Sequence, residues 1–391
     1  NKAMRKFFIV TTLFLLPFIS EAARMDVAVW VPWFADEAGA ESALDNISDI
    51  DIIYPFVFEV TSEGELVNRV DFDDDHWDDL LDEADDRRVE VIPTIAWFDG
   101  AAIHDVLSSR RSRNDHIDEI VKKVKKYGFD GVNIDYESRL AETMDDYSEF
   151  LADLKDELGR RRELTSTVEA RTPPESRWRD VPENIEYSND YREMNKHCDW
   201  VEIMAYDQQR ADWQLNSKRR GVPYAPVADT EWVDKVIDLA LEDFDEDKVM
   251  LGVATYGRAW DVTVAADWFK EYDSVASLNQ PRIIELADKY DSQIGRTEGG
   301  VAVITYFPED SVWRVFDALP APKVTPKGYE AAAKALLVAT YANIEIPVRM
   351  VTWSDAEAIE EKLELVEDYD LKGVAVFKVD GEEDPAIWKE F

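Results

Sequence analysis

The segment Phe129-Asp130-Gly131-Val132-Asn133-Ile134-Asp135-Tyr136-Glu137 has the pattern of a β-strand with one polar face. Residues two apart in a strand point to the same side, so Asn133, Asp135 and Glu137 share a face and the apolar residues between them share the other. Burying such a polar row costs free energy unless its groups are satisfied. At the carboxyl end of a barrel strand, a polar row of this kind is typical of an active site. The segment therefore predicts a barrel strand whose inner face carries chemistry.

Outward from this segment, short apolar runs alternate with amphipathic helical stretches from residue 25 onward. This alternation is typical of βαβ units and a parallel sheet. Eight expected strands separated by helices favour a closed barrel over an open sheet. The expected strands are 26–31, 52–58, 89–95, 131–136, 163–168, 200–205, 249–254 and 373–377. The clearest helical patterns are at 117–127, 144–158, 233–241 and 356–369.

The interval between the seventh and eighth expected strands, about 255 to 372, is far longer than one helix requires. It contains a helix candidate at 281–290, a β-like run at 301–307 and an Ala-rich helix candidate at 329–342. We therefore predict an α/β fold, a (β/α)8 TIM barrel with a small α+β insertion between strands 7 and 8. The insertion is expected at about 261–345, where it would form one wall of a cleft.

The first residues have the pattern of an export signal. Arg5 and Lys6 precede an apolar run at 7–19, and Ser20-Glu21-Ala22 places small residues at the two positions that a signal peptidase recognises. The run is too short for a comfortable transmembrane span. We expect 1–22 to be a signal peptide, and 23–391 to be a secreted barrel, extracellular or at the cell envelope, with no stable membrane insertion. The alternative is an N-terminal anchor that is never cleaved.

The chain is strongly acidic, with 84 Asp and Glu against 44 Lys and Arg and a net charge of −40. The acidic residues are spread along the sequence, which indicates a solvated acidic surface rather than a disordered acidic tail. Such a surface repels nucleic acid, so no nucleic-acid partner is expected. Adaptation to high salt, where screening shortens the reach of self-repulsion, is our interpretation, and a cationic partner is the alternative.

The segment at 129–137 resembles the catalytic motif of glycoside hydrolase family 18, the chitinase-type enzymes. That motif is Asp-Gly-x-Asp-x-Asp-x-Glu, and this sequence matches it at Asp130, Gly131, Asp135 and Glu137. It departs at Asn133, where the Asn is similar to chitobiase-like members and to the spore-germination, cortex-lytic branch. The departure weakens the relay by which one aspartate passes charge to the next.

Three further motifs, the last of them in two parts, extend the resemblance in the same order. Met204-Ala205-Tyr206-Asp207 resembles the Met-x-Tyr-Asp signature of the sixth strand, and 251–260 resembles the seventh-strand pattern Gly-x-x-x-Tyr-Gly-Arg-x-Trp. The segments 351–355 and 371–374 are similar to the approach to strand eight. Four ordered motifs from about residue 25 to the C-terminus make the resemblance specific.

The resemblance implies hydrolysis with retention, in which the acetamido oxygen of the substrate is the nucleophile. By position, Glu137 would protonate the leaving oxygen and later activate water. Asp135 would hold the acetamido N–H, and the hydroxyl of Tyr206 would donate to the acetamido oxygen. The other residues implied at the substrate are Asn133, as a support for Asp135, and Asp207, Arg258, Phe377 and Trp97. Trp30 and Trp33 are further candidates for stacking on a sugar.

Phe377 stands where the family usually places a Trp at the end of strand eight. A Phe ring also stacks on a sugar, but it covers less area and has no N–H. The four histidines are scattered, without the paired spacing of metal ligands, and there is no Gly-rich phosphate loop. We therefore expect neither a metal site nor an organic cofactor.

Together these features predict a secreted, monomeric glycoside hydrolase acting on β-linked N-acetylglucosamine-containing glycans. The substrate would be a carbohydrate polymer or oligosaccharide of the peptidoglycan or chitin-like type. One alternative is a catalytically silent, lectin-like barrel, which the presence of Glu137 disfavours because such lectins typically lose that residue. Another is a purely structural or partner-binding barrel whose insertion is the functional surface.

Overall fold

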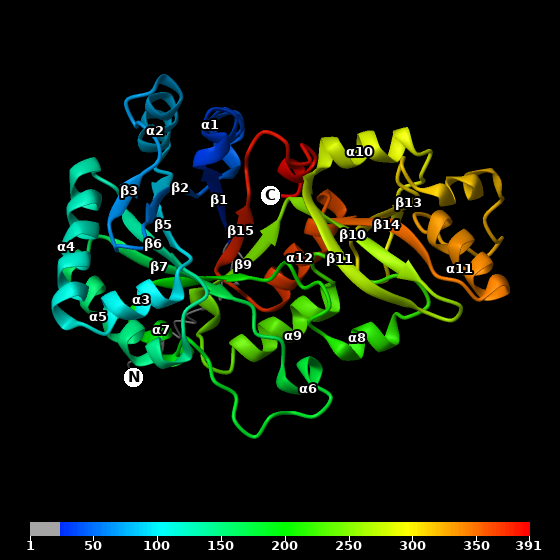
Figure 1. Cartoon of the computed structure of the whole chain (residues 1–391). Helices are drawn as coiled ribbons and strands as arrows, with labels where there is room; N and C mark the ends of the chain where they lie inside the picture. Colours follow the sequence, from blue (N-terminus) through cyan, green and yellow to red (C-terminus); the bar gives the residue numbers. More distant parts are fainter. Residues whose placement is uncertain (1–23) are drawn as a thin grey trace, which may run out of the picture.

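The computed structural model describes residues 24–391, so the expected signal peptide at 1–22 lies outside the described residues. Eight parallel strands close a barrel, because the last of them, β15, pairs with both β9 and β1 (Figure 1). The barrel strands are β1 Asp26–Pro32, β2 Ile52–Val60, β5 Thr94–Trp97, β6 Gly131–Tyr136, β7 Glu163–Glu169, β8 Trp200–Met204, β9 Val249–Ala254 and β15 Gly373–Phe377. The predicted barrel is thus confirmed.

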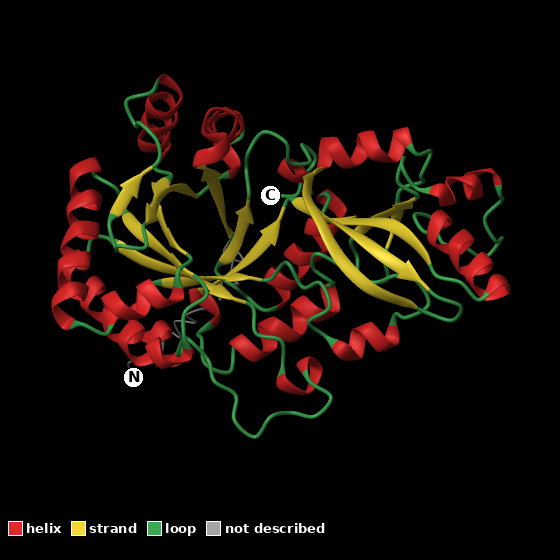
Figure 2. Cartoon of the chain, viewed as in Figure 1, coloured by secondary structure: helices red, strands yellow, loops and turns green. Residues whose placement is uncertain are grey.

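Helices cover the outside of this barrel (Figure 2). They are α1 Asp36–Asp45, α2 Asp75–Arg87, α3 Gly100–Leu107, α4 Arg110–Tyr127, α5 Met144–Leu158, α7 Tyr191–His197, α9 Thr230–Ala240 and α12 Ala356–Asp368. Two shorter helices, α6 Pro174–Arg177 and α8 Trp213–Lys218, lie in the connections after β7 and β8. Short 3-10 turns occur at Trp33–Ala35, Ile47–Asp49, Ala141–Thr143, Glu246–Lys248, Val312–Ala318 and Ile387–Lys389. No helix within 24–391 has the length and apolar character needed to cross a bilayer.

The third expected strand is split into two pieces. The short strand β4, Glu90–Val91, and β5 both pair with β2, and Pro93 lies between them. Proline has no N–H to donate to a ladder, which explains the interruption. An additional short strand, β3 Leu66–Asn68, pairs antiparallel with the end of β2.

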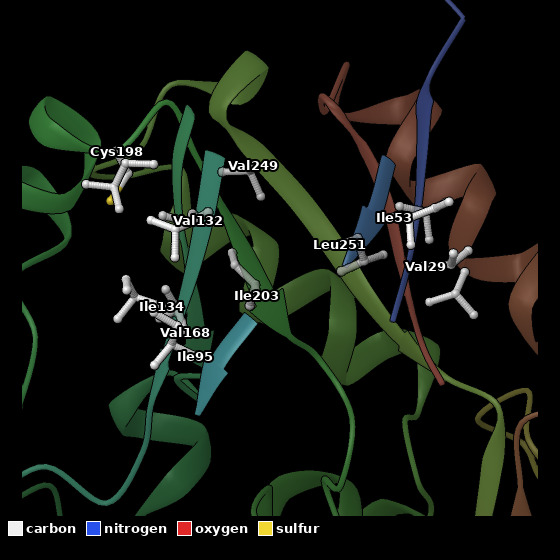
Figure 3. Packing of buried hydrophobic residues seen from close by; sticks show 14 of the residues in the cluster. Val29, Ile53, Ile95, Val132, Ile134, Val168, Cys198, Ile203, Val249 and Leu251 are labelled. Carbon is white, nitrogen blue, oxygen red and sulfur yellow. The ribbon is translucent and has the colours of Figure 1, made fainter. Parts of the chain in front are cut away.

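The alternation of side chains along the barrel strands produces two buried regions, one between the barrel and its helices and one inside the barrel. Val132 and Ile134 of β6 face outward into the apolar layer beneath the helices, as Figure 3 shows. The inner face contains a smaller aromatic cluster that includes Trp30, Tyr54 and Trp200. Burying each large aliphatic side chain contributes about 1.5–3 kcal/mol, so the outer layer stabilises the barrel while the inner face remains available for polar groups.

A second sheet lies between β9 and β15 in the sequence, at the right in Figure 1. Its antiparallel strands have the order β11-β10-β14-β13-β12, with β10 Tyr256–Val264, β11 Phe269–Asn279, β12 Gly295–Arg296, β13 Ala302–Tyr306 and β14 Ile346–Trp353. The helices α10 Gln280–Lys289 and α11 Glu330–Ala342 accompany it. The fold class with its insertion is therefore confirmed, although the sheet runs from Tyr256 to Trp353, beyond the expected 261–345.

Gly131, the first residue of β6, provides a test of the strand packing. A Cβ added there would overlap the carbonyl oxygen of Glu163 in β7, whereas one added at Gly221 would meet no heavy atom within 4 Å. We expect Gly131→Ala to lower the free energy of unfolding by roughly 1–3 kcal/mol, because the backbone of β6 must move. Urea unfolding measures this change, with Gly221→Ala as the control. Equal stability of the two variants would contradict the packing described here.

Candidate active site

A cavity of about 640 Å³ opens at the carboxyl ends of the barrel strands. Most of its lining comes from the barrel and the loops that follow its strands, and Tyr256 and Arg258 come from β10 of the second sheet. The second sheet thus forms one wall of the cavity. Six of the eight predicted site residues line it, namely Asp135, Glu137, Tyr206, Asp207, Arg258 and Phe377. Within residues 24–391, no group of three His, Cys, Asp or Glu side chains is arranged to hold a metal ion.

Asp135 and Glu137 enter this cavity from the end of β6. The N–H of Glu137 donates to the carbonyl oxygen of Trp97 at 2.8 Å, which holds the chain beside β5 where β6 ends. Asp135 is only 4% exposed, and its Oδ1 accepts a hydrogen bond from the hydroxyl of Thr167 in β7. Glu137 is half-buried and lines the cavity. The two carboxyl groups are therefore neighbours on one strand face, as the sequence pattern predicts.

The two carboxyl groups have perturbed acidities for different reasons. Burial raises the pKa of Asp135 to about 6, although the Thr167 hydroxyl opposes this shift by stabilising the carboxylate. Burial and the neighbouring negative charge of Asp135 together raise the pKa of Glu137 to about 8. Two carboxylates at one site cannot both ionise freely. Near neutral pH the arrangement thus favours an ionised Asp135 beside a protonated Glu137.

Two charged residues not identified from the sequence act on this pair. Glu169 ends β7, lines the cavity and accepts the N–H of Ser138 at 3.3 Å. Arg139 is 7% exposed, and its guanidinium carbon lies 4.0 Å from the ring centre of Tyr147. The negative charge of Glu169 raises the pKa values of Asp135 and Glu137, and the positive charge of Arg139 lowers both. The pKa values of the carboxyl pair are therefore shifted in opposite directions by one negative and one positive side chain.

Tyr206, Asp207 and Arg258 form a second cluster in the cavity. Asp207 accepts hydrogen bonds from the hydroxyl of Tyr256 at 2.8 Å and from Nε of Arg258 at 2.7 Å. Its other contact with the Arg258 guanidinium, at 2.5 Å, makes the ion pair bidentate. Burial raises the pKa of Tyr206 well above its usual value, which keeps its hydroxyl protonated and able to donate. The charge of Arg258 is thus already matched by Asp207.

Phe377 provides an aromatic surface at the base of the cavity. Its ring stacks nearly parallel to that of Tyr206, with centroids 6.0 Å apart and an interplanar angle of 13°. Edge contacts with Trp30 and Phe56 support it from the other strands. The peptide bond after Phe377 is cis, and the N–H of Thr255 donates to the carbonyl oxygen of Phe377 at 3.0 Å. The contacts with Tyr206, Trp30 and Phe56 hold the ring at the cavity.

Asn133, which we expected at the substrate, lies below the cavity and is fully buried. Its Oδ1 accepts the hydroxyl of Thr94 at 2.9 Å, and its Nδ2 donates to Thr165 at 2.7 Å and to Glu202 at 2.8 Å. These neighbours satisfy the amide within the barrel. The expectation of a substrate contact is corrected accordingly, because Asn133 belongs to a polar layer one step beneath Asp135 on the same strand face.

Glu202 of β8 is the centre of that layer and was not identified from the sequence. It is fully buried, and its Oε1 accepts the hydroxyl of Tyr54 at 2.5 Å, while Nε1 of Trp200 donates to the same hydroxyl at 2.9 Å. Burial raises the pKa of Glu202 to about 7, although the hydrogen bonds from Tyr54 and other neighbours oppose the shift. A buried carboxyl group thus sits next to the amide that replaces the expected aspartate.

Trp97 is the second residue whose expected role is wrong. It is 1% exposed and lies in the apolar layer outside the barrel, where its ring meets the edge of Tyr136 with centroids 5.4 Å apart. In β5 the inner face is formed by Thr94 and Ala96, so Trp97 faces the helices with Ile95. Trp30 and Trp33, which were named as stacking candidates, do line the cavity.

The missed residues of β7 and β8 follow the same two-residue period that identified β6. Thr165, Thr167 and Glu169 form the inner row of β7, and Glu202 occupies the inner face of β8. Polar residues at every second position of β7 were a signal available in the sequence, and in β8 the signal was a single glutamate between apolar residues. Arg139 left no such signal, because it lies in a loop and its place depends on Tyr147 of α5.

A closed parallel barrel with a carboxyl pair at the end of its fourth strand, and a second sheet forming one cleft wall, defines a TIM barrel built for acid-base chemistry. The sequence pattern of the family described as glycosyl hydrolases family 18 matches residues 49–382, and the chain belongs to this family.

Individual relatives are more distant. The uncharacterized glycosylase YvbX of Bacillus subtilis (strain 168) is 26% identical over 182 residues, which are 46% of this chain and 49% of YvbX. The crystal structure of the spore cortex-lytic enzyme SleL of Bacillus cereus has a TM-score of 0.67 at 18% identity, over 94% of this chain and 73% of SleL. A chitinase from Cycas revoluta, in complex with (GlcNAc)3, has a TM-score of 0.65 at 15% identity, over 93% and 98% of the two chains.

The family match and the solved structures show the family and the fold of this chain. The chain spans about half the length, or less, of the first curated relatives it matches. At 15–18% identity, the two solved structures show the shared fold. The family membership is therefore established for the barrel. The reaction and its substrate have to be inferred from the geometry of the cavity.

The buried Glu202 predicts a dependence of stability on pH. Since its pKa is raised to about 7, against about 4.3 for an unfolded glutamate, the folded chain binds this proton more tightly. The resulting stabilisation is present at low pH and is lost as the pH rises through about 7. We expect Glu202→Gln to show a smaller fall in Tm between about pH 5 and about pH 8 than the unaltered chain. Glu183→Gln, in an exposed loop, is the control, and parallel Tm curves for all three proteins would contradict the assignment.

Proposed function

We propose that this chain is a retaining glycoside hydrolase that cleaves β-linked N-acetylglucosamine-containing glycans by substrate-assisted catalysis. The observation that carries the proposal is the Asp135–Glu137 pair at the cavity, where Asp135 is disposed to be ionised while Glu137 stays protonated. A proton donor and an adjacent carboxylate are the two groups that this reaction requires. Membership of glycosyl hydrolases family 18 supports the same reaction class.

In the first step, the protonated Glu137 donates its proton to the leaving glycosidic oxygen while the acetamido oxygen attacks the anomeric carbon. The ionised Asp135 accepts the acetamido N–H and stabilises the positive charge of the resulting oxazolinium ring. The hydroxyl of Tyr206 donates to the acetamido oxygen and orients it before attack. In the second step, Glu137 takes a proton from a water molecule while the water oxygen attacks the anomeric carbon. The bond from that carbon to the acetamido oxygen breaks, which restores the acetamido group and leaves Glu137 protonated. Each role falls on a side chain that lines the cavity.

The aromatic lining supports a sugar ligand. Tyr206 and Phe377 present nearly parallel rings, and Trp33 adds further aromatic surface to the same cavity, whereas Trp30 is only 1% exposed. Such surfaces pack on the apolar faces of sugar rings. The Cycas revoluta chitinase was solved with (GlcNAc)3, and relatives include cortical fragment-lytic enzymes, which is consistent with either chitin-like or peptidoglycan chains. The proposal includes export and action as a monomer, as the sequence pattern suggests.

A catalytically silent, lectin-like barrel is the alternative. It would bind the same sugars without cleaving them, and it would have no need for a carboxyl group of raised pKa facing the cavity. The presence of Glu137 at that place, with its acidity perturbed by Asp135, favours the enzyme.

The proposed acid is tested by Glu137→Gln, assayed with N-acetylglucosamine oligomers at low and at molar NaCl. We expect a fall in kcat of about 10²–10⁴-fold, because Gln cannot donate the proton, with oligomer binding largely kept. NMR of the fresh products of the unaltered chain should show the β anomer. Release of the α anomer would exclude the substrate-assisted mechanism even if hydrolysis occurred.

The pH profile tests the charge state of the pair. Hydrolysis requires Asp135 ionised and Glu137 protonated, so kcat/KM should fall below a pH of about 6 and above a pH of about 8. Since the positive charge of Arg139 lowers both pKa values, Arg139→Met should move both limbs of the profile to higher pH. Arg161→Met, in the exposed loop before β7 at the other end of the barrel, is the control. An unchanged profile in Arg139→Met would exclude this electrostatic role.

A further inference from the structure

A second hollow of about 460 Å³ lies beside the cavity that holds the carboxyl pair. Glu169, Ala170, Thr172 and Arg177 line both hollows, so the two are joined along one wall. The outer side of the second hollow is formed by the segment 178–189, which runs without helix or strand between α6 and α7 (Figure 1). The cleft therefore continues past the proposed catalytic groups as a groove, which we call the side groove.

Two arginines line the side groove, and neither has a carboxylate of residues 24–391 within 4.0 Å of its guanidinium. The guanidinium of Arg171 lies between the rings of Tyr187 and Tyr191, 3.9 Å and 3.7 Å from their centres, and Nη2 donates to the carbonyl oxygen of Asn189. Arg177 is exposed, and its guanidinium carbon lies 5.1 Å from the ring centre of Trp178. Aromatic rings thus position both cations without neutralising them.

The charges of the adjoining cavity are matched differently. Arg258 is bound by Asp207 in a bidentate pair, and Glu59 is paired with Arg69. Among the described cavity residues, Arg177 is therefore the cation that has no carboxylate partner. In a chain with 84 acidic residues, such an arginine at the junction of two hollows is free to bind an anion from the ligand.

We propose that the side groove binds a sugar residue that carries a carboxylate, next to the glycosidic bond in the main cavity, and that Arg177 is the ligand of that carboxylate. The guanidinium presents a planar fork that matches a carboxylate with two parallel hydrogen bonds. Arg171, held between its two tyrosines, adds positive charge to the same groove, where it offsets the negative charge of Glu169 and Glu186 in the lining. The inference rests on the proposed function, since the bond to be cleaved lies in the adjoining cavity.

Two kinds of glycan supply such a carboxylate. One is an N-acetylated sugar with a lactyl ether, and the other is a uronic acid that alternates with an N-acetylated sugar. Both place the anion on the residue next to an N-acetylhexosamine, so both fit the side groove. A neutral chitin-type chain has no carboxylate for Arg177, so its affinity should depend much less on the charge of that arginine.

Binding is measured by calorimetry on the Glu137→Gln variant, which keeps the oligomers intact. The ligands are three tetrasaccharides: neutral N-acetylglucosamine, the same backbone with lactyl ethers on alternate residues, and alternating N-acetylglucosamine and uronic acid. We expect at least one carboxylated ligand to bind more tightly than the neutral one at low NaCl. Adding Arg177→Gln should reduce that preference by about fivefold, as for a partly exposed charge pair. Molar NaCl should reduce it as well.

Arg179→Gln is the matched control. Arg179 is also exposed and also lies over a tryptophan, 5.4 Å from the ring centre of Trp213, but it lines neither hollow. This variant should keep the preference of its parent. Preference for only one of the two carboxylated ligands would identify the source of the carboxylate.

The inference is overturned if neither carboxylated ligand binds more tightly than the neutral one, or if Arg177→Gln and Arg179→Gln have the same effect. Failure of the proposed function gives a different result. In that case the unaltered chain cleaves none of the three oligomers, while the binding preference and its dependence on Arg177 are still measured in the Glu137→Gln background.

Discussion

Two carboxyl groups on one strand face, at Asp135 and Glu137, impose the constraint on which the rest of the site depends. Asp135 is buried and Glu137 is half-buried at one cavity, so a second negative charge there is unfavourable and one proton is retained. Which group retains it is decided by the surroundings. The Thr167 hydroxyl stabilises charge on Asp135, whereas the Glu137 side chain accepts no hydrogen bond from residues 24–391 and lies near the negative charge of Asp135. In the proposed mechanism, the division of roles between the acid Glu137 and the orienting carboxylate Asp135 thus follows from hydrogen bonding to one of two similar groups.

The polar layer beneath the pair shows how the barrel tolerates such an interior. Asn133, Glu202 and Tyr54 satisfy one another through short hydrogen bonds across three strands. A buried network of this kind stabilises the fold only when each of its polar groups is hydrogen-bonded. Because the partners come from different strands, these hydrogen bonds also fix the register of those strands. The carboxyl group of this layer is contributed by β8, and the amide by β6. The inner face of β6 therefore carries fewer negative charges than a strand with three consecutive acidic positions would.

Much of this architecture could be predicted from the sequence, because regular elements leave periodic patterns. The barrel strands were found from apolar runs and β6 from its polar alternation, and α5 at Met144–Leu158 matched its expected bounds. Strand β11 was missed because its residues are largely exposed, so it has no apolar run to mark it. Trp97 was misplaced because a tryptophan at the end of a barrel strand suggested sugar stacking. Its position in the alternation of β5 instead directs its side chain toward the helices.

The residues that no pattern could reveal are those placed by tertiary contacts. Arg139 is buried through a tyrosine of α5 and a carbonyl oxygen in the loop before α7, and Arg171 is held between two tyrosines. Their charges act locally, at distances where the surrounding protein screens little. The acidic surface acts from farther away, and molar salt confines its reach to about 3 Å. The pKa values of the carboxyl pair are therefore governed by a few buried groups near it, and the chain can carry a large net negative charge without losing the proton on Glu137, the proposed donor.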